Sequence, residues 1–455
     1  MTYRRDRFPR LRAVVAMGTA VALAATGCAG AGGGSSDGKA VVTIATVANP
    51  QMQDIEKLSQ EFEKANPDID LKFSILPENE LRDRVTQDIA TKAGQYDVVT
   101  IGTYETPIWA KNGWLTKLDS YASTPEYDVG DIIAPVKEAL SYNGGLYAVP
   151  FYGESSFLMY RKDLFDKAGL KMPEQPTWQQ VAEFAAKLDD PDGKVAGICL
   201  RGLPGWGEVM APLTTLINTF GGRWYDTQWN AHLTDPATKE AVKFYVDLVR
   251  EHGEPGAPNA GFTECMTAFG QGNAAMWYDA TVAASSLEDA KTSKVAGKVG
   301  YVKAPVVKTR NSGWLWAWSL AMPETSKHKD AAWKFMQWAT SKEYIQLVGR
   351  RLGWERVPPG TRRSTYQIPE YTKAAAAFAD LTLESMNSVD PKQPGLEPQP
   401  WVGVQYVAIP EFQDLGTKVS QEISAAIAGK QSVDQALDKA QRYAEETAQK
   451  AGLKK

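Results

Sequence analysis

The chain has 455 residues, and its 50 lysine and arginine residues against 54 aspartate and glutamate residues leave a formal net charge of −4 at pH 7. So small and dispersed a charge argues against a nucleic-acid-binding surface, which needs clustered lysine and arginine. The length is sufficient for two sizeable domains after a short N-terminal segment.

The N-terminus has the layout of a secretory signal. A cationic start precedes an apolar stretch over residues 13–25, which is short for a transmembrane helix. The following Thr26-Gly27-Cys28 resembles the end of a bacterial lipobox, although Ala25 stands where leucine is usual. We therefore expect a signal peptide over 1–27, a lipidated Cys28 and a flexible glycine-rich tether to residue 39. An ordinary signal peptide with a bystander cysteine is the alternative, and the export route, general or twin-arginine, stays open.

The first part of the remaining chain predicts a parallel α/β sheet. The expected strands cover residues 41–46, 71–75 and 96–101, with amphipathic helices between them. Ligands in such sheets bind beyond the carboxyl ends of the strands. The segments that follow Thr46 and Ile101 are thus expected at the mouth of a site.

A second α/β region follows. Its expected elements are strands at 146–150 and 157–160, helices after Thr177 and over 331–338, and a final helix that Ser432 and Gln435 cap. Residues 391–400 are proline-rich and are expected to form a loop.

Cys199 and Cys265 are the two cysteines besides Cys28, and an even pair in an exported chain favours a disulfide over two separate buried thiols.

Several short motifs occur in an order that resembles a known family. They are Ala-Asn-Pro at 65–67, Asp-Val-Val-Thr at 97–100, Tyr-Ala-Val-Pro at 147–150, Tyr-Arg-Lys-Asp-Leu-Phe at 160–165, Pro-Thr-Trp at 176–178 and Phe-Gly-Gln-Gly-Asn-Ala-Ala-Met at 269–276. The chain thereby resembles the extracytoplasmic solute-binding proteins of carbohydrate ABC importers, which include the maltodextrin-binding proteins. Segments 199–202, 205–208, 220–224 and 312–318 resemble the sorbitol/mannitol-type subgroup.

This resemblance implies an α/β fold of two lobes, the periplasmic-binding-protein type II fold, with the ligand in a cleft between lobes joined by a hinge. Lobe one would comprise 40–150 plus 306–360, and lobe two 151–305 plus 361–455. It further implies delivery of the ligand to permease subunits. We also expect a monomer without cofactor or bound metal, anchored outside the cell membrane through Cys28.

A sugar or polyol site combines polar groups for hydroxyls with aromatic faces for C–H surfaces. Glu154 is the foremost candidate, because the resemblance places a ligand-binding carboxylate there; a hinge salt bridge is its alternative. Asp279 follows another strand, where it is expected to face the cleft or to cap a helix. Tyr152 is a further polar candidate. Asn49, Tyr104 and Glu105 are candidates with a turn role as the alternative, and Arg201 and Arg356 are candidates with a solvated or paired surface charge as the alternative.

The tryptophans supply the aromatic candidates. Trp206 lies between two glycines, which favours a loop, and Trp314, Trp316 and Trp318 alternate, so that a strand would place them on one face. We expect Trp206, Trp314 and Trp316 near the ligand and Trp318 in the core.

Reversible binding of a small neutral polyol or sugar is the leading hypothesis. A disaccharide, or an anionic sugar derivative held by Arg201 or Arg356, is an alternative on the same fold. A glycoside hydrolase that uses Glu154 and Asp279 is the alternative from another class. Against an enzyme, the sequence contains no nucleophile elbow or phosphate loop, and its histidines, His232, His252 and His328, lack metal-ligand spacing.

Overall fold

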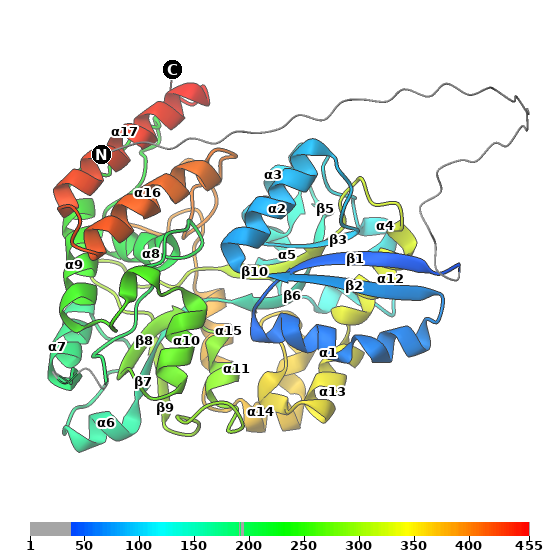
Figure 1. Ribbon diagram of the computed structural model, residues 1–455, viewed down its shortest axis with the longest axis horizontal. Helices are drawn as coiled ribbons and strands as arrows, with labels where there is room; N and C mark the ends of the chain where they lie inside the picture. The colour runs from blue at the N-terminus through cyan, green and yellow to red at the C-terminus, as the bar shows by residue number, and fades with distance from the viewer. Residues whose placement is uncertain (1–37, 191, 193–194, 455) are drawn as a thin grey trace, which may run out of the picture. The chain divides into compact units, whose positions relative to one another are not determined.

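A computed structural model describes residues 38–190, 192 and 195–454 (Figure 1). The predicted signal peptide, Cys28 and most of the predicted tether lie outside these residues. Within the described residues, no helix is both long and apolar enough to cross a membrane. Among the described residues, two larger sheets and one two-stranded hairpin organise the part of the chain from Ala40 onward.

The larger sheet has five strands in the order β2-β1-β3-β10-β6. Its strands are β1 (Ala40–Val47), β2 (Ile69–Leu76), β3 (Val98–Ile101), β6 (Ala148–Glu154) and β10 (Trp316–Ala321). β1 pairs in parallel with β2 and β3, as predicted, whereas β10 runs antiparallel to both β3 and β6. The chain thus leaves this sheet after β6 and returns to it with β10.

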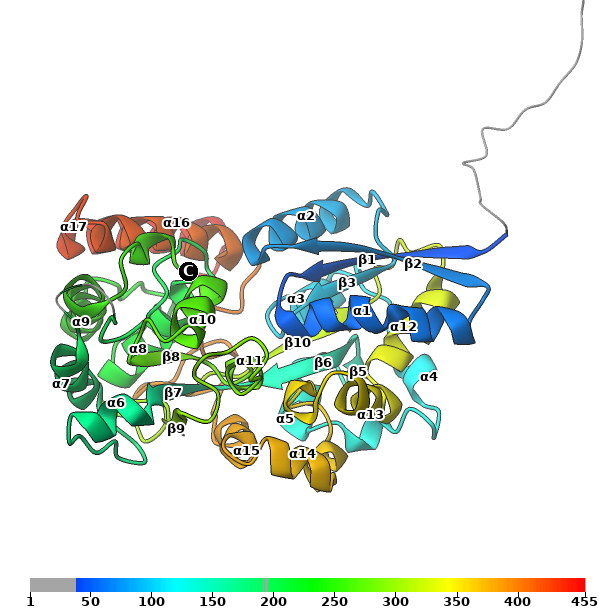
Figure 2. The same ribbon diagram turned by 60° about the horizontal axis from the view of Figure 1, so that its bottom comes forward.

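Helices cover both faces of the larger sheet, with α2 and α3 on one side and α1 on the other (Figures 1 and 2). The elements around it are α1 (Pro50–Ala65), α2 (Glu78–Thr91), α3 (Glu105–Lys111), α4 (Asp119–Ala122), η1 (Val129–Asp131), α5 (Ala134–Ala139), the hairpin of β4 (Ser141–Tyr142) and β5 (Gly145–Leu146), α12 (Lys329–Ala339), α13 (Lys342–Arg351), η3 (Trp354–Arg356), η4 (Arg363–Gln367) and α14 (Pro369–Ala374). In α1, Ile55, Leu58 and Phe62 are buried, as their helical spacing predicted.

The smaller sheet is antiparallel, in the order β8-β7-β9. Its strands are β7 (Ser156–Arg161), β8 (Met276–Ala280) and β9 (Val299–Lys303). The helices around it are α6 (Lys162–Lys167), α7 (Trp178–Leu188), α8 (Met210–Phe220), α9 (Pro236–His252), η2 (Ala257–Asn259), α10 (Phe262–Gly270), α11 (Ala283–Leu287), α15 (Ala379–Asn387), α16 (Phe412–Ile427) and α17 (Val433–Lys450). Only Ser155 separates β6 of the larger sheet from β7, so one extended segment connects the two sheets.

Local sequence accounts for several element boundaries. Thr177 and Gln180 form the predicted capping box at the start of α7, and Ser432 and Gln435 form the one at the start of α17. The proline-rich residues 391–400 contain neither helix nor strand. Cys199 and Cys265 are joined by a disulfide, with their Cα atoms 5.6 Å apart.

Candidate ligand-binding site

A cavity lies where elements of the two sheets meet. Seven of the predicted ligand residues line it: Asn49, Tyr152, Glu154, Arg201, Trp206, Trp314 and Trp316. The other lining residues are Glu78, Arg82, Gly207, Ala211, Phe262, Ala280, Val282, Trp318 and Gln405.

One wall of the cavity is a face shared by β6 and β10. Glu154 pairs with Trp316 in the antiparallel register, and Tyr152 pairs with Trp318. Residues directly opposite each other on antiparallel strands project to the same side, so all four side chains share this face. The Tyr152 hydroxyl also accepts a 2.6 Å hydrogen bond from Asn49 Nδ2 at the start of α1.

Trp318 lies in the core, as predicted, but the prediction did not include its second place in the cavity wall. Trp318 is buried, but it lines the cavity together with Trp316, at a ring-centroid distance of 5.5 Å. The strand alternation that places Trp316 in the cavity applies to Trp318 as well. Trp314 precedes the first residue of β10 and contacts the cavity from the connecting segment.

Arg201 is a buried guanidinium held by acidic partners. Its Nε and Nη2 donate to the two carboxylate oxygens of Asp279 at 2.8 and 2.6 Å. Its Nη1 donates to Gly207 O at 2.9 Å and to Glu208 Oε2 at 3.3 Å. Burial alone would lower the pKa of Arg201, but pairing with Asp279 raises it well above its ordinary value, so the group stays charged.

Two carboxyl groups near Arg201, those of Glu154 and Glu208, have raised pKa values. Burial raises the pKa of Glu154 to about 8, although Arg201 acts in the opposite direction. Burial and the neighbouring Glu78 likewise raise the pKa of Glu208. Near neutral pH, Glu154 is therefore able to donate a hydrogen bond as well as to accept one.

A second guanidinium, that of Arg82 on α2, lies among aromatic rings. It is bound by Glu78 at 2.9 Å and by Glu105. Its Cζ atom lies 3.9 Å from the ring centroid of Trp206 and 4.8 Å from that of Trp318. The charge thereby orders the tryptophan faces that a ligand's C–H surface would contact.

Four predicted ligand residues do not line the cavity. Tyr104 packs on Trp206 at 4.7 Å and donates a 2.8 Å hydrogen bond to Ile409 O. Glu105 binds Arg82, and Asp279 binds Arg201, so both support cavity residues from behind. Arg356 lies elsewhere, because Asp54 and Asp289 bind its guanidinium.

Sequence reasoning missed Glu78, Arg82, Phe262 and Gln405. Glu78 and Arg82 are four residues apart on α2, a spacing that resembles an ordinary surface ion pair. Phe262 begins α10, and Gln405 lies in the loop before α16, where no local pattern distinguishes it. The position of Glu78 immediately after β2 and Pro77 was an available indication, because strand ends border the site.

Two polar atoms at the cavity have no hydrogen-bond partner among the described residues. They are the Nε1 donor of Trp206 and the Oε1 acceptor of Gln405. A buried polar atom without a partner is costly, and a ligand that offers both an acceptor and a donor would satisfy both atoms. A hydroxyl group provides each of these functions.

Residues 49–346 match the family described as bacterial extracellular solute-binding protein. The chain belongs to this family. It is 48% identical over 421 residues to a mannitol-binding protein of Pseudomonas aeruginosa, covering 92% of this chain and 96% of that protein. The predicted family is thereby confirmed, and membership implies an extracytoplasmic location.

Two solved structures extend the comparison. One is a solute-binding protein of an ABC transporter from Agrobacterium vitis with bound D-mannitol, at 53% identity and a TM-score of 0.89, covering 90% of this chain and 99% of that one. The other comes from Agrobacterium radiobacter in complex with ribitol, at 27% identity and a TM-score of 0.80, covering 90% and 98%. The solute-binding protein therefore has the predicted two-lobed α/β fold.

Proposed function

We propose that this solute-binding protein captures D-mannitol or a closely related alditol and delivers it to the permease of an ABC importer. The observation that carries the proposal is the 53% identity to a structure with bound D-mannitol, over 99% of that chain. The relative named mannitol-binding protein and the structure with ribitol support the same ligand class.

The cavity supports a neutral, hydroxyl-rich ligand. The two guanidinium groups there already have carboxyl partners: Glu78 and Glu105 bind Arg82, and Glu208 and Asp279 bind Arg201. A phosphate or sulfonate would have to compete with these carboxyl groups for both guanidinium groups, which argues against the anionic alternative. Arg201 has five N–H donors, of which its protein contacts engage four, so one is left for a ligand hydroxyl.

The same contacts argue against a hydrolase that uses Glu154 and Asp279. A glycosidase needs two carboxyl groups that face its substrate. Asp279 is bound through both oxygens by Arg201 and does not line the cavity, so it cannot pair with Glu154 for that chemistry. We therefore propose reversible binding without catalysis, by a protein that acts as a monomer and without a metal or cofactor.

The proposed ligand contacts are hydrogen bonds with Glu154, Arg201, Trp206 Nε1 and Gln405 Oε1, and C–H contacts with Trp316 and Trp318.

The two lobes would follow the two sheets. Their predicted ranges, 40–150 plus 306–360 and 151–305 plus 361–455, remain a proposal. β6 continues through Pro150 to Glu154 in the larger sheet, and α15 packs against β7 and β9 of the smaller one.

Calorimetric titration of the purified full-length protein tests the ligand. D-mannitol, sorbitol, arabinitol and ribitol are compared with glucose, trehalose and mannitol 1-phosphate. We expect an alditol to bind most tightly. Tighter binding of trehalose or of the phosphate ester would contradict the proposal, as would release of a sugar from a chromogenic glycoside.

Anchoring is a separate proposal that rests on Cys28 and the lipobox-like residues before it. Cys28→Ser should move the protein from the membrane fraction to the soluble extracytoplasmic fraction without a change in ligand affinity. Unchanged membrane association of this variant would contradict lipidation of Cys28.

A further inference from the structure

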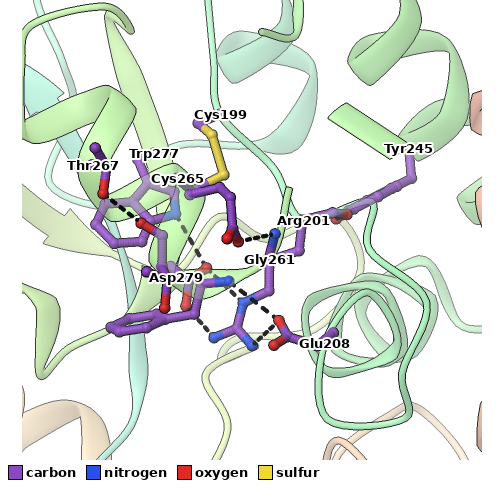
Figure 3. The surroundings of a disulfide bond; sticks show 12 residues. Cys199, Arg201, Glu208, Tyr245, Gly261, Cys265, Thr267, Trp277 and Asp279 are labelled. Atoms are coloured by element: carbon purple, nitrogen blue, oxygen red, sulfur yellow. Dashed lines mark hydrogen bonds and ion pairs between the residues drawn. A yellow bond between two sulfur atoms is a disulfide. The ribbon is translucent and has the colours of Figure 1, made fainter. Parts of the chain in front are cut away.

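The Cys199–Cys265 disulfide lies directly behind two residues that line the cavity. Cys199 precedes Arg201 by two positions in an irregular segment between α7 and α8, and Cys265 follows Phe262 on α10. Arg201 and Phe262 both line the cavity. Figure 3 shows the disulfide beside the ion-pair cluster of Arg201, Asp279 and Glu208.

The segment that carries Arg201 has neither helix nor strand of its own, so contacts with its neighbours hold it. Cys199 N donates to Met276 O at 2.8 Å, which attaches the segment to β8. The Tyr245 hydroxyl donates to Arg201 O at 2.6 Å, and Gly202 N donates to Ala260 O at 2.8 Å. The disulfide is the covalent member of this set, and it attaches the segment to α10.

The first turn of α10 and the Arg201 side chain share contacts. Phe262 N donates to Glu208 Oε2 at 3.2 Å, and the same oxygen accepts from Arg201 Nη1. The Arg201 Cζ atom lies 5.3 Å from the Phe262 ring centroid. A displacement of α10 relative to the 199–203 segment would therefore disturb the guanidinium, the carboxyl group and the aromatic ring together.

We propose that the Cys199–Cys265 disulfide is a positioning element of the ligand site, so that ligand affinity depends on the redox state of this bond. The inference rests on the proposed function, because it concerns the affinity of that same site. A disulfide that acted only on the unfolded chain would change the melting temperature and leave the affinity of the folded protein unchanged. Positioning instead predicts a change in affinity, because binding needs Arg201 and Phe262 in one arrangement.

A phosphine can reduce the Cys199–Cys265 disulfide to two free thiols. The phosphine supplies two electrons and takes an oxygen atom from water to become a phosphine oxide. The S–S bond breaks, and each sulfur receives one proton from that water. Both cysteines are fully buried, so reduction requires prolonged incubation and a count of free thiols after mild unfolding of an aliquot.

The test compares the oxidised full-length protein, its phosphine-reduced form and the double variant Cys199→Ala/Cys265→Ala. Calorimetry gives the Kd for D-mannitol, and thermal denaturation gives the melting temperature. We expect the Kd to rise about tenfold in both forms that lack the bond, together with a lower melting temperature. Leu437→Ala, which truncates a buried side chain in α17, is the matched control and should lower the melting temperature without changing the Kd.

A Kd within about twofold of the oxidised protein's, in either form that lacks the bond, would overturn the inference. If the double variant does not fold, the reduced wild-type protein decides the question. Failure of the oxidised protein to bind any alditol or sugar would instead overturn the proposed function, and this inference with it. Binding by the oxidised protein with an unchanged Kd on reduction removes the inference alone.

Discussion

Two buried indole nitrogens, those of Trp206 and Trp401, lack a hydrogen-bond acceptor among the described residues, and only Trp206 lines the cavity. If a ligand hydroxyl accepts from Trp206 Nε1, Trp206→Phe should keep an aromatic surface and lose one hydrogen bond. Loss of a hydrogen bond with a net contribution of about 1 kcal/mol predicts an about fivefold higher Kd for D-mannitol, measured by calorimetry.

Trp401→Phe is the matched control for this substitution. It removes an unpartnered indole N–H outside the cavity and should leave the Kd unchanged. Equal affinities of the Trp206→Phe variant and the wild-type protein would show that Trp206 Nε1 does not contact the ligand.

Glu154 and Glu254 provide a matched pair for pH dependence. Burial raises the pKa of each carboxyl group from 4.5 to about 8, but only Glu154 lines the cavity. Between about pH 5 and pH 8 the folded protein keeps protons that the unfolded chain has released. The free energy of unfolding should therefore fall as the pH rises through this window, by on the order of a few kcal/mol per group.

Glu154→Gln and Glu254→Gln should each flatten the dependence of the free energy of unfolding on pH, measured by urea denaturation at pH 5, 6.5 and 8. Only Glu154→Gln should also weaken D-mannitol binding. A wild-type protein that becomes more stable between pH 5 and pH 8, relative to both variants, would contradict the raised pKa values.

At the scale of elements, the end of β3 depends on a close contact with β10. A Cβ atom on Gly102 would lie 1.9 Å from Cζ2 of Trp316, so alanine at this position would displace the indole ring from the cavity wall. We expect Gly102→Ala to cost about 1–3 kcal/mol of stability and to weaken ligand binding, measured by thermal denaturation and calorimetry.

Gly270→Ala in α10 serves as the control for this change. Its nearest neighbour would be Leu287 Cδ2 at 3.7 Å, an ordinary van der Waals contact, so stability and affinity should stay near wild-type values. Wild-type affinity in Gly102→Ala would show that the Trp316 ring position is not needed for binding.

Patterns within single elements predicted those elements well. The helical spacing of α1, the capping boxes of α7 and α17 and the alternation of β10 involve residues close in sequence, whose geometry depends on local backbone periodicity. The pairing of β10 with β6 does not follow from either strand alone. It places Trp316 and Trp318 opposite Glu154 and Tyr152, so that Trp318 lines the cavity as well as lying in the core.

At the scale of the whole molecule, Arg356 connects parts of the chain associated with different sheets. Its Nη2 lies 2.6 Å from Asp54 of α1, beside the larger sheet, and its Nη1 lies 2.9 Å from Asp289, which follows α11 near the smaller sheet. If the lobes separate without ligand, this pairing stabilises the closed form alone. Arg356→Ala should then raise the Kd for D-mannitol up to about tenfold by calorimetry.

Arg351→Ala is the control, because Arg351 is exposed and pairs with Glu61, which lies on α1 as Asp54 does. It should leave the Kd unchanged, as expected of a surface ion pair. Identical affinities of the Arg356→Ala and Arg351→Ala variants would show that the Asp289 contact plays no part in closure.

The sequence by itself determined the family, the two-lobed α/β class and most of the cavity-lining aromatic residues, because ordered motifs and strand alternation are local properties. Only the tertiary structure decided which charges line the cavity. Glu105, Asp279 and Arg356 have the chemistry of ligand contacts, but none of them lines the cavity. Glu105 and Asp279 bind the lining residues Arg82 and Arg201 from behind, and Arg356 binds Asp54 elsewhere. Their partners are distant in sequence, and a buried charge takes its role from the nearest opposite charge in the fold.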